Sequence, residues 1–425
     1  MKIVGLITEY NPFHNGHLYH IHESLRITGA DAALVVMSGD YVQRGTPAIM
    51  PKRLRTEMAL YCGAGAVLEL PVCYATGSAE FFALGAISLL DSLGIVDSVC
   101  FGSECSDLPL LQKIAGLLVD EPEQYREILR HELKLGKSFP AARQTAVVFC
   151  TGDPRCADIL KDPNNILGKK ALKKCGSSIR PYTIRRKGAG YHSSQLDGLY
   201  SSASAIRSLL AYSSSSIHTE FAGDDSTELS FSDILNELGN QVPKKCLELL
   251  SDFHKIQYPV YQNDFSLILK YKLLNKHPKS LVRYMDVSPE LAARICTSLN
   301  DFFNYKQFAG LLKTKELTQT RINRALLHIM LGIKKDSVSE YMNSGYNFYA
   351  RLLGFRKDCS QILTEISKKS SLPLLTKLAE SRELCELGQR MLRDDILASN
   401  LYTSVVTDKF KTAFLNEYKQ RIIKI

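Results

Sequence analysis

Short apolar runs alternate with segments of helical spacing through the first third of the chain. Apolar residues are nearly continuous over residues 3–7, a pattern typical of a strand buried on both faces, so residues 1–8 are predicted to form a central parallel strand. The alternation continues with strand-like runs at 32–40, 66–71 and 98–104 and with helical spacing at 52–62 and 77–93. Strands that alternate with helices predict an α/β fold with a parallel sheet and crossover helices.

Three of the apolar runs end in turns rich in polar residues or glycine. The turns are EYNPFHNGH after Ile7, SGDYVQRG after Met37 and GSE after Phe101. The carboxyl ends of parallel strands lie at one edge of an open sheet, and ligands bind beyond that edge. We therefore expect the three turns to share one rim of the sheet.

The rest of the chain is mostly helical in pattern. Residues 106–160 have helical spacing, 181–192 are strand-like, and the serines of 201–207 are candidate helix N-caps. Residues 212–228 are polar and unpatterned, which indicates a domain boundary. We predict an α/β domain at 1–212, a linker at 213–230 and a mainly α-helical domain at 231–425.

The charge of the chain is unevenly distributed. The net charge of +9 divides into about −1 for residues 1–230 and about +10 for 231–425, and residues 161–190 alone carry about +8. Because Lys and Arg contacts to phosphates supply most non-specific affinity for nucleic acid, this distribution favours a polyanionic partner. The alternative is a solvated surface that keeps the protein soluble.

Composition excludes several classes of protein. With 45% apolar and 23% charged residues, the chain is not expected to be disordered. Its 11 cysteines are scattered singly without C-x-x-C spacing, which is typical of a reduced, cytoplasmic protein and does not favour structural zinc. No signal peptide and no stretch approaching ~18 uninterrupted apolar residues is apparent, so no membrane span is expected.

The stretch YNPFHNGH after the first strand is the most informative one. Pro12 biases Asn11 away from helix, and helical spacing resumes a few residues later, so the stretch is predicted to be a strand-to-helix turn. Free N–H groups and the helix dipole make such a turn suited to an anion, and Gly16 lets a ligand approach the backbone. His14 and His17 can donate to a phosphate whose charge grows during nucleotidyl transfer. The alternatives are a surface pair or a metal pair on one helix face.

This turn resembles the HIGH-type motif of nucleotidyltransferases and class I aminoacyl-tRNA synthetases. A longer series of blocks, from residue 3 to about 356, resembles the bacterial tRNA(Met) cytidine acetate ligases. The blocks are VGLITEYNPFHNGHLYH, VMSGDYVQRGTPA, FGSE, PNNILG, RRKGAGYH, SASAIR, TRINRALLHIMLGI and YARLLGF.

The resemblance implies a Rossmann-like, HIGH-type nucleotidyltransferase domain followed by a basic helical domain that binds tRNA. It implies a reaction in which ATP and acetate give acetyl-adenylate and pyrophosphate. The acetyl group then passes to the exocyclic amine of the wobble cytidine of elongator tRNA(Met). ATP, with Mg²⁺ expected alongside it, and acetate are therefore the implied small molecules.

The expected site residues follow from the resemblance, the predicted rim and the charge. Catalytic roles are expected for His14, His17, Asp40 and Glu104. Asp40 and Glu104 would each help to hold magnesium or to position the amine. The alternative for each is a structural role, in which it caps a helix or pairs with an arginine. The ATP-binding set is Ile7, Thr8, Glu9, Tyr10, Asn11, Pro12, Phe13, His14, Asn15, Gly16, His17, Leu18, Tyr19, His20, Gly102, Asn164, Asn165, Arg185 and Arg186. The RNA-binding set is Lys169, Lys170, Lys173, Lys174, Lys313 and Lys315.

Two other functions fit parts of the pattern. A small-molecule nucleotidyltransferase would use the same histidine turn and the SASAIR block, but it gives no role to a large basic helical domain. A non-catalytic RNA-binding protein would use the charge, but it does not need an intact His14, Gly16 and His17. The sequence predicts no oligomeric state and identifies no resident metal site.

Overall fold

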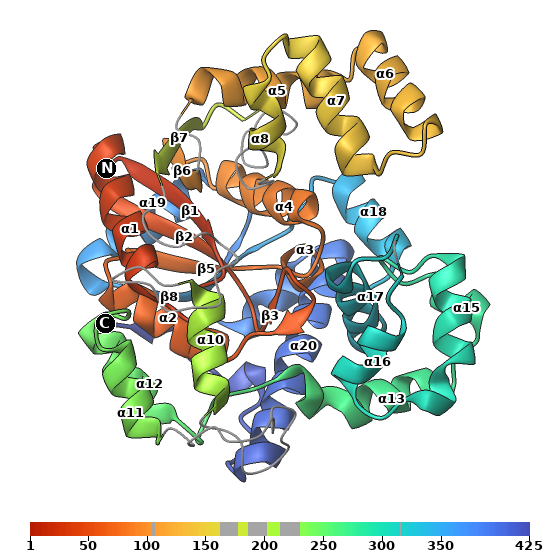
Figure 1. The fold of residues 1–425 in the computed structure, drawn as a ribbon. Helices are drawn as coiled ribbons and strands as arrows, with labels where there is room; N and C mark the ends of the chain where they lie inside the picture. The colour runs from red at the N-terminus through yellow and green to blue at the C-terminus, as the bar shows by residue number, and fades with distance from the viewer. Residues whose placement is uncertain (104–106, 162–176, 186–201, 213–229, 315) are drawn as a thin grey trace.

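The structure is a computed structural model that describes residues 1–103, 107–161, 177–185, 202–212, 230–314 and 316–425 (Figure 1). Within these residues the central sheet has eight strands in the order β10-β8-β5-β2-β1-β6-β7, with β9 paired to β8. The strand bounds are β1 Ile3–Thr8, β2 Ala32–Ser38, β5 Ala66–Leu70, β6 Ser98–Ser103, β7 Arg180–Arg185, β8 Ala350–Phe355, β9 Leu374–Leu375 and β10 Ile423–Lys424. A separate hairpin pairs β3 (Tyr41–Val42) with β4 (Thr46–Pro47).

The N-terminal strands pair as the sequence predicts. β1 runs parallel to β2 and β6, β5 is parallel to β2, and β7 is parallel to β6. Alternate residues of β2 enter opposite cores: Leu34 and Val36 face one core, and Ala33 and Val35 face the other. The continuous apolar runs therefore arise because these strands are covered on both faces.

Helices cover both faces of the sheet (Figure 1). One core contains side chains of α1 and α2, and the other contains side chains of α4. The helices of the N-terminal half are α1 Asn15–Thr28, α2 Lys52–Tyr61, α3 Val72–Ala75, α4 Ala79–Ser92, α5 Leu108–Asp120, α6 Glu123–Lys134, α7 Phe139–Thr151, α8 Arg155–Lys161 and α10 Ala203–Tyr212. Helices α5 to α8 have a small core of their own and lie at the top of Figure 1.

The C-terminal part is largely helical, as predicted. Its helices are α11 Phe231–Leu238, α12 Lys244–Phe253, α13 Ser266–Leu274, α14 Pro278–Leu281, α15 Pro289–Thr297, α16 Tyr305–Leu311, α17 Gln319–Leu331, α18 Lys335–Asn343, α19 Gln361–Lys369 and α20 Glu386–Phe410. None of the helices in the described ranges is long and apolar enough to cross a membrane.

Three strands of this C-terminal part were not predicted. β8 adds to the N-terminal sheet by pairing antiparallel with β5, and β9 and β10 then pair with β8. A short apolar run such as ARLLGF cannot be distinguished from a buried helical segment by its periodicity, which is why the pattern predicted a mainly helical part without these strands. The two parts of the chain thus share one sheet, and the domain limits stay a prediction.

Candidate nucleotide site at the amino end of the first helix

The predicted strand-to-helix turn is present at the carboxyl end of β1. Backbone geometry changes sharply after the strand, with φ of 48° at Tyr10 and a cis peptide bond between Asn11 and Pro12. Helix α1 then begins at Asn15, and His14 is its N-cap. The first turn of α1, where the N–H groups and the helix dipole point outward, therefore lies at the edge of the sheet where ligands are expected.

The two predicted histidines contact each other at this helix end. Their ring centroids are 3.8 Å apart with the planes tilted by 30°, and both residues are half-buried. The His17 ring also contacts the fully buried rings of Tyr10, at 4.9 Å, and Phe13, at 5.5 Å. The apolar residues of the motif thus hold His17 in place, and the turn joins His14 and His17 as one unit.

His14 has a second role that the sequence analysis did not predict. Its Nδ1 accepts a hydrogen bond from the backbone N–H of Gly16 at 3.0 Å, so the imidazole caps α1. A Cβ atom on Gly16 would lie 2.8 Å from Cε1 and 3.0 Å from Nδ1 of His14. The glycine therefore makes room for the capping ring, in addition to its predicted role in letting a ligand approach.

Buried Arg55 of α2 fixes the loops that follow β1 and β2. Its guanidinium donates to the carbonyl oxygens of Glu9 at 2.6 Å, Ser38 at 3.1 Å and Met50 at 3.1 Å, and also to that of Gly39. Burial lowers the pKa of this arginine, because charged groups lose hydration in the interior. Arg55 was not predicted from the sequence, because its partners are backbone carbonyl oxygens that leave no residue pattern.

Two later segments also contact the histidine turn. Arg207 of α10, within the SASAIR block, donates to the carbonyl oxygen of Asn11 at 2.6 Å. Ser202 accepts from the N–H of Ala205 at 3.1 Å, as expected of a serine at a helix start. The backbone N–H of Asn15 donates to the carbonyl oxygen of Gln241 at 2.9 Å, so the loop between α11 and α12 supports α1 as well.

Gly102 and Arg185 reach the same edge of the sheet. β6 and β7 pair in parallel with Gly102 opposite Ile184 and with Ser103 opposite the exposed Arg185. From α1, His20 lies 3.2 Å from the carbonyl oxygen of Cys100 on β6, which ties the first helix to this strand. The described part of the predicted ATP set is therefore gathered at neighbouring strand ends.

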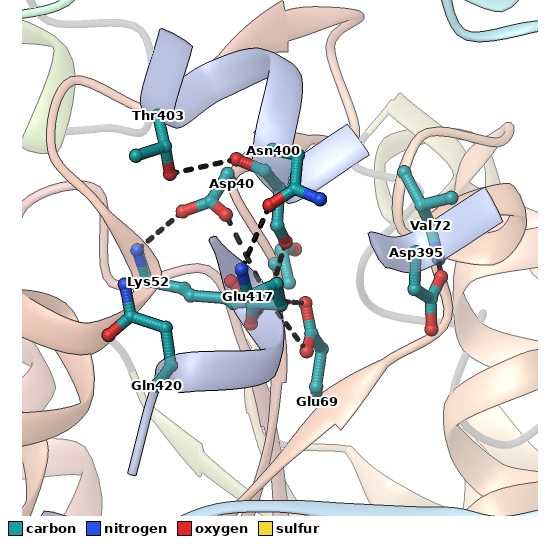
Figure 2. Close-up of polar contacts among 12 residues, drawn as sticks. Asp40, Lys52, Glu69, Val72, Asp395, Asn400, Thr403, Glu417 and Gln420 are labelled. Carbon is teal, nitrogen blue, oxygen red and sulfur yellow. Dashed lines mark hydrogen bonds and ion pairs between the residues drawn. The ribbon is translucent and has the colours of Figure 1, made fainter. Parts of the chain in front are cut away.

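Asp40 lies at this edge in a buried group of charges, here called the Lys52 cluster, with Lys52, Glu69 and Glu417 (Figure 2). Buried Arg351 completes the cluster through its ion pairs with Glu69 and Glu417. Asp40 accepts the backbone N–H of Lys52 at 2.7 Å, which corresponds to the alternative helix-capping role. The Lys52 ammonium contacts the carboxylates of Glu69 and Glu417, each at 2.8 Å. A catalytic role for Asp40 stays a prediction.

The carboxyl groups of the Lys52 cluster differ in their pKa. Burial raises the pKa of Asp40, whose nearest oxygen to the Lys52 ammonium is 3.9 Å away. Burial also acts on Glu417, but Lys52 and Arg351 outweigh it and lower the pKa of Glu417 to about 2. Arg351 binds both Glu417 and Glu69, the latter at 3.0 Å. Lys52 and Arg351 therefore hold Glu417 in its charged form.

Several expected site residues lie outside the described residues. They are Glu104, Asn164, Asn165, Arg186, Lys169, Lys170, Lys173, Lys174 and Lys315. Lys313 is described and is exposed just beyond α16. In the part of the chain that the structure describes, no three His, Cys, Asp or Glu side chains are grouped so that they could hold a metal ion.

Comparison with known proteins agrees with this geometry. A family model described as HIGH Nucleotidyl Transferase matches residues 1–417. The mostly parallel sheet, the histidine turn and this match define the chain as a member of the HIGH nucleotidyltransferase family.

Two curated relatives are both named tRNA(Met) cytidine acetate ligase. That of Caldanaerobacter subterraneus subsp. tengcongensis is 42% identical over 407 residues, which cover 95% of each chain. That of Acetivibrio thermocellus is 39% identical over 429 residues, which cover 100% of each chain.

Solved structures give the same result. Thermotoga maritima TmcAL without ligand matches with a TM-score of 0.89 and 31% identity, and TmcAL bound with alpha-thio ATP matches with a TM-score of 0.87 and 30% identity. Both matches cover 100% of each chain. Within the HIGH nucleotidyltransferases, this chain belongs to the tRNA(Met) cytidine acetate ligase family, which confirms the resemblance and the fold class predicted from the sequence.

Proposed function

We propose that this protein activates acetate with ATP and acetylates the exocyclic amine of the wobble cytidine of elongator tRNA(Met), which forms N4-acetylcytidine. In the first step an acetate oxygen attacks the α-phosphorus of ATP, and pyrophosphate leaves. In the second step the cytidine amine attacks the acetyl carbon, AMP leaves, and the amine loses a proton. The contact of His14 with His17 at the amino end of α1 is the observation that carries the proposal.

The hydrogen bonding of His14 supports a donor role toward phosphate. A backbone N–H can only donate, so the nitrogen of His14 that accepts from Gly16 carries no proton. In the neutral ring the proton is then on Nε2, which is the atom from which His14 can donate to a phosphate oxygen. His17, held by Tyr10 and Phe13, is placed to act on the same group. Fixed donors of this kind stabilise charge that develops on the phosphates during transfer.

Arg185 extends this phosphate site along the edge of the sheet. A guanidinium stays charged and binds two phosphate oxygens together, which suits the triphosphate. Mg²⁺ that accompanies ATP is usually bound by one or two protein carboxylates and by the phosphates. It would neutralise phosphate charge during transfer. Asp40 and Glu104 are the acids that we assign to it or to the amine. We place the protein in the cytoplasm, where ATP, acetate and tRNA meet.

Isotope exchange between ATP and pyrophosphate tests the proposal. The purified protein should catalyse exchange only when acetate is present, and it should then form N4-acetylcytidine on a tRNA(Met) transcript, detected by mass spectrometry of the nucleosides. Exchange that requires a different acceptor would indicate a small-molecule nucleotidyltransferase. Absence of exchange with every acceptor, together with tight tRNA binding, would indicate a non-catalytic RNA-binding protein.

A further inference from the structure

Helix α13 exposes a row of large apolar side chains. Leu267, Tyr271 and Leu274 are 80%, 67% and 60% exposed. Their spacing of four and three residues places them on one face of the helix. The opposite face, with Leu269 and Leu273, is buried in the main core. Large apolar side chains that are exposed next to one another, and not scattered singly, are typical of a binding surface.

Phe303 adds a second aromatic ring beside this row. Its side chain is 84% exposed, although the backbone around it is held firmly. The N–H of Tyr305 donates to Ser266 Oγ at 2.9 Å, and the N–H of Lys306 donates to Asn263 Oδ1 at 2.9 Å. These bonds attach the loop to the start of α13. The ring is thus presented to solvent from a fixed backbone.

The surroundings of these rings are positively charged. Residues 261–313 contain eight Lys and Arg but four Asp and Glu. Two of these acids are already paired: Asp264 binds Lys409 of α20 at 2.7 Å, and Asp286 binds Arg324 of α17 at 2.8 Å. The two remaining acids, Glu290 and Asp301, are outnumbered by the lysines and arginines of the segment. The surface therefore complements a polyanion.

We propose that this surface binds unpaired bases of RNA. The surface, here called the α13 face, consists of Leu267, Lys270, Tyr271, Leu274, Phe303 and Lys306. Exposed aromatic rings stack on unpaired bases, and neighbouring lysines bind the phosphates between them. Lys270, whose ammonium donates to the carbonyl oxygen of Phe302 at 3.2 Å, lies between the helix and the Phe303 loop.

Neither a base-paired RNA helix nor an apolar protein partner would account for both the exposed rings and the lysines. A base-paired helix offers phosphates but hides its base faces, so it gives no role to Tyr271 and Phe303. An apolar protein partner gives no role to the lysines. The inference rests on the proposed function in one respect, since the RNA is then tRNA(Met), whose loops supply unpaired bases. α13 lies with α15 and α16 at the lower right of Figure 1, far from the α5 to α8 group at the top.

Binding assays on Tyr271→Ala and Phe303→Ala test the inference. Each substitution should weaken binding of an elongator tRNA(Met) transcript roughly tenfold, within the range for loss of one stacked base. Phe303→Trp, which keeps a ring, should restore the affinity. Phe149→Ala on α7 is the matched control, because Phe149 is 62% exposed on the other side of the molecule, and it should bind tRNA normally.

Two further measurements separate stacking from other roles. A fully paired RNA duplex should bind wild type and both alanine variants equally, and acetate-dependent exchange should be unchanged in both variants. Equal losses for tRNA and duplex, or no loss for tRNA, would overturn the inference. Normal tRNA affinity with altered self-association in sedimentation would assign the α13 face to a second copy of the chain instead. Absence of acetate-dependent exchange in the wild type would count against the proposed function and leave the binding comparison intact.

Discussion

The histidine turn and the Lys52 cluster lie at the same edge of the sheet but are assembled in opposite ways. The turn obtains Tyr10, Phe13, His14 and His17 from one continuous stretch, and its ring and capping contacts join residues at most seven positions apart. The Lys52 cluster instead joins Asp40, Glu69, Arg351 and Glu417, which are spread over most of the chain. Local sequence therefore builds the histidine turn, whereas distant segments supply the charges that bind the C-terminal part to the sheet.

The two regions also differ in whether removal of one side chain should affect the reaction or the stability of the fold. The histidines are half-buried at a surface turn, so their loss should act on the reaction more than on folding. The charges of the Lys52 cluster are buried, and a buried charge that loses its partner keeps its full desolvation cost. We therefore expect variants of the histidines to lose activity without loss of stability. Variants of the Lys52 cluster should lose stability.

The largest effect on stability is expected for Lys52→Met. The change leaves three buried carboxylates with Arg351 as the remaining cation of the cluster, and removal of one partner from a buried ion pair typically destabilises a protein by about 3–5 kcal/mol. The thermal unfolding midpoint should fall accordingly. Arg26→Met is the matched control, because Arg26 is 70% exposed in its pair with Glu23 and its loss should not move the midpoint. A Lys52→Met variant that unfolds at the wild-type temperature would show that the cluster does not hold the two parts of the chain together.

Glu417→Gln should have a somewhat smaller effect that depends on pH. The pKa of Glu417 is lowered to about 2 in the folded protein, so the charged carboxylate stabilises the fold above its ordinary pKa near 4.5. The stabilisation is about 3 kcal/mol at neutral pH if each pKa unit contributes ~1.4 kcal/mol. It is lost as the pH falls from about 4.5 toward 2. Unfolding midpoints of wild type and variant should therefore differ at pH 6 and converge toward pH 3; a constant difference would contradict the assigned pKa.

His14→Ala and His17→Ala should affect the reaction instead. Each should slow acetate-dependent exchange by about 100-fold or more, which corresponds to about 2.7 kcal/mol of lost transition-state stabilisation. His14→Asn separates the two roles of His14, because asparagine caps helices well but is too short to replace the imidazole Nε2. It should restore the stability of the alanine variant without restoring exchange. Near-normal exchange in either folded alanine variant would remove that histidine from the mechanism.

The same contrast explains which features the sequence could predict. The first strand, its turn and α1 follow from periodicity, Pro12 and the histidine spacing, all within about twenty residues. The pairing of β8 with β5 and the ion pair of Lys52 with Glu417 depend on contacts between residues hundreds of positions apart. No local pattern carries that information. Arg55 was missed for a related reason, since its partners are backbone carbonyl groups that any sequence possesses.

The smallest expected effect concerns a surface that belongs to neither region. Lys313→Glu combined with Lys315→Glu should weaken tRNA binding about threefold at moderate salt and reduce the slope of log affinity against log salt by about 1, as loss of roughly one phosphate contact predicts. Acetate-dependent exchange and the unfolding midpoint should not change, because Lys313 is exposed and lies in a different part of the fold. Lys245→Glu with Lys411→Glu is the charge-matched control, since both lysines are exposed and already paired with acids. Equal slopes for the two double variants would mean that tRNA senses the overall charge of the C-terminal part, and the assignment of Lys313 and Lys315 would then be wrong.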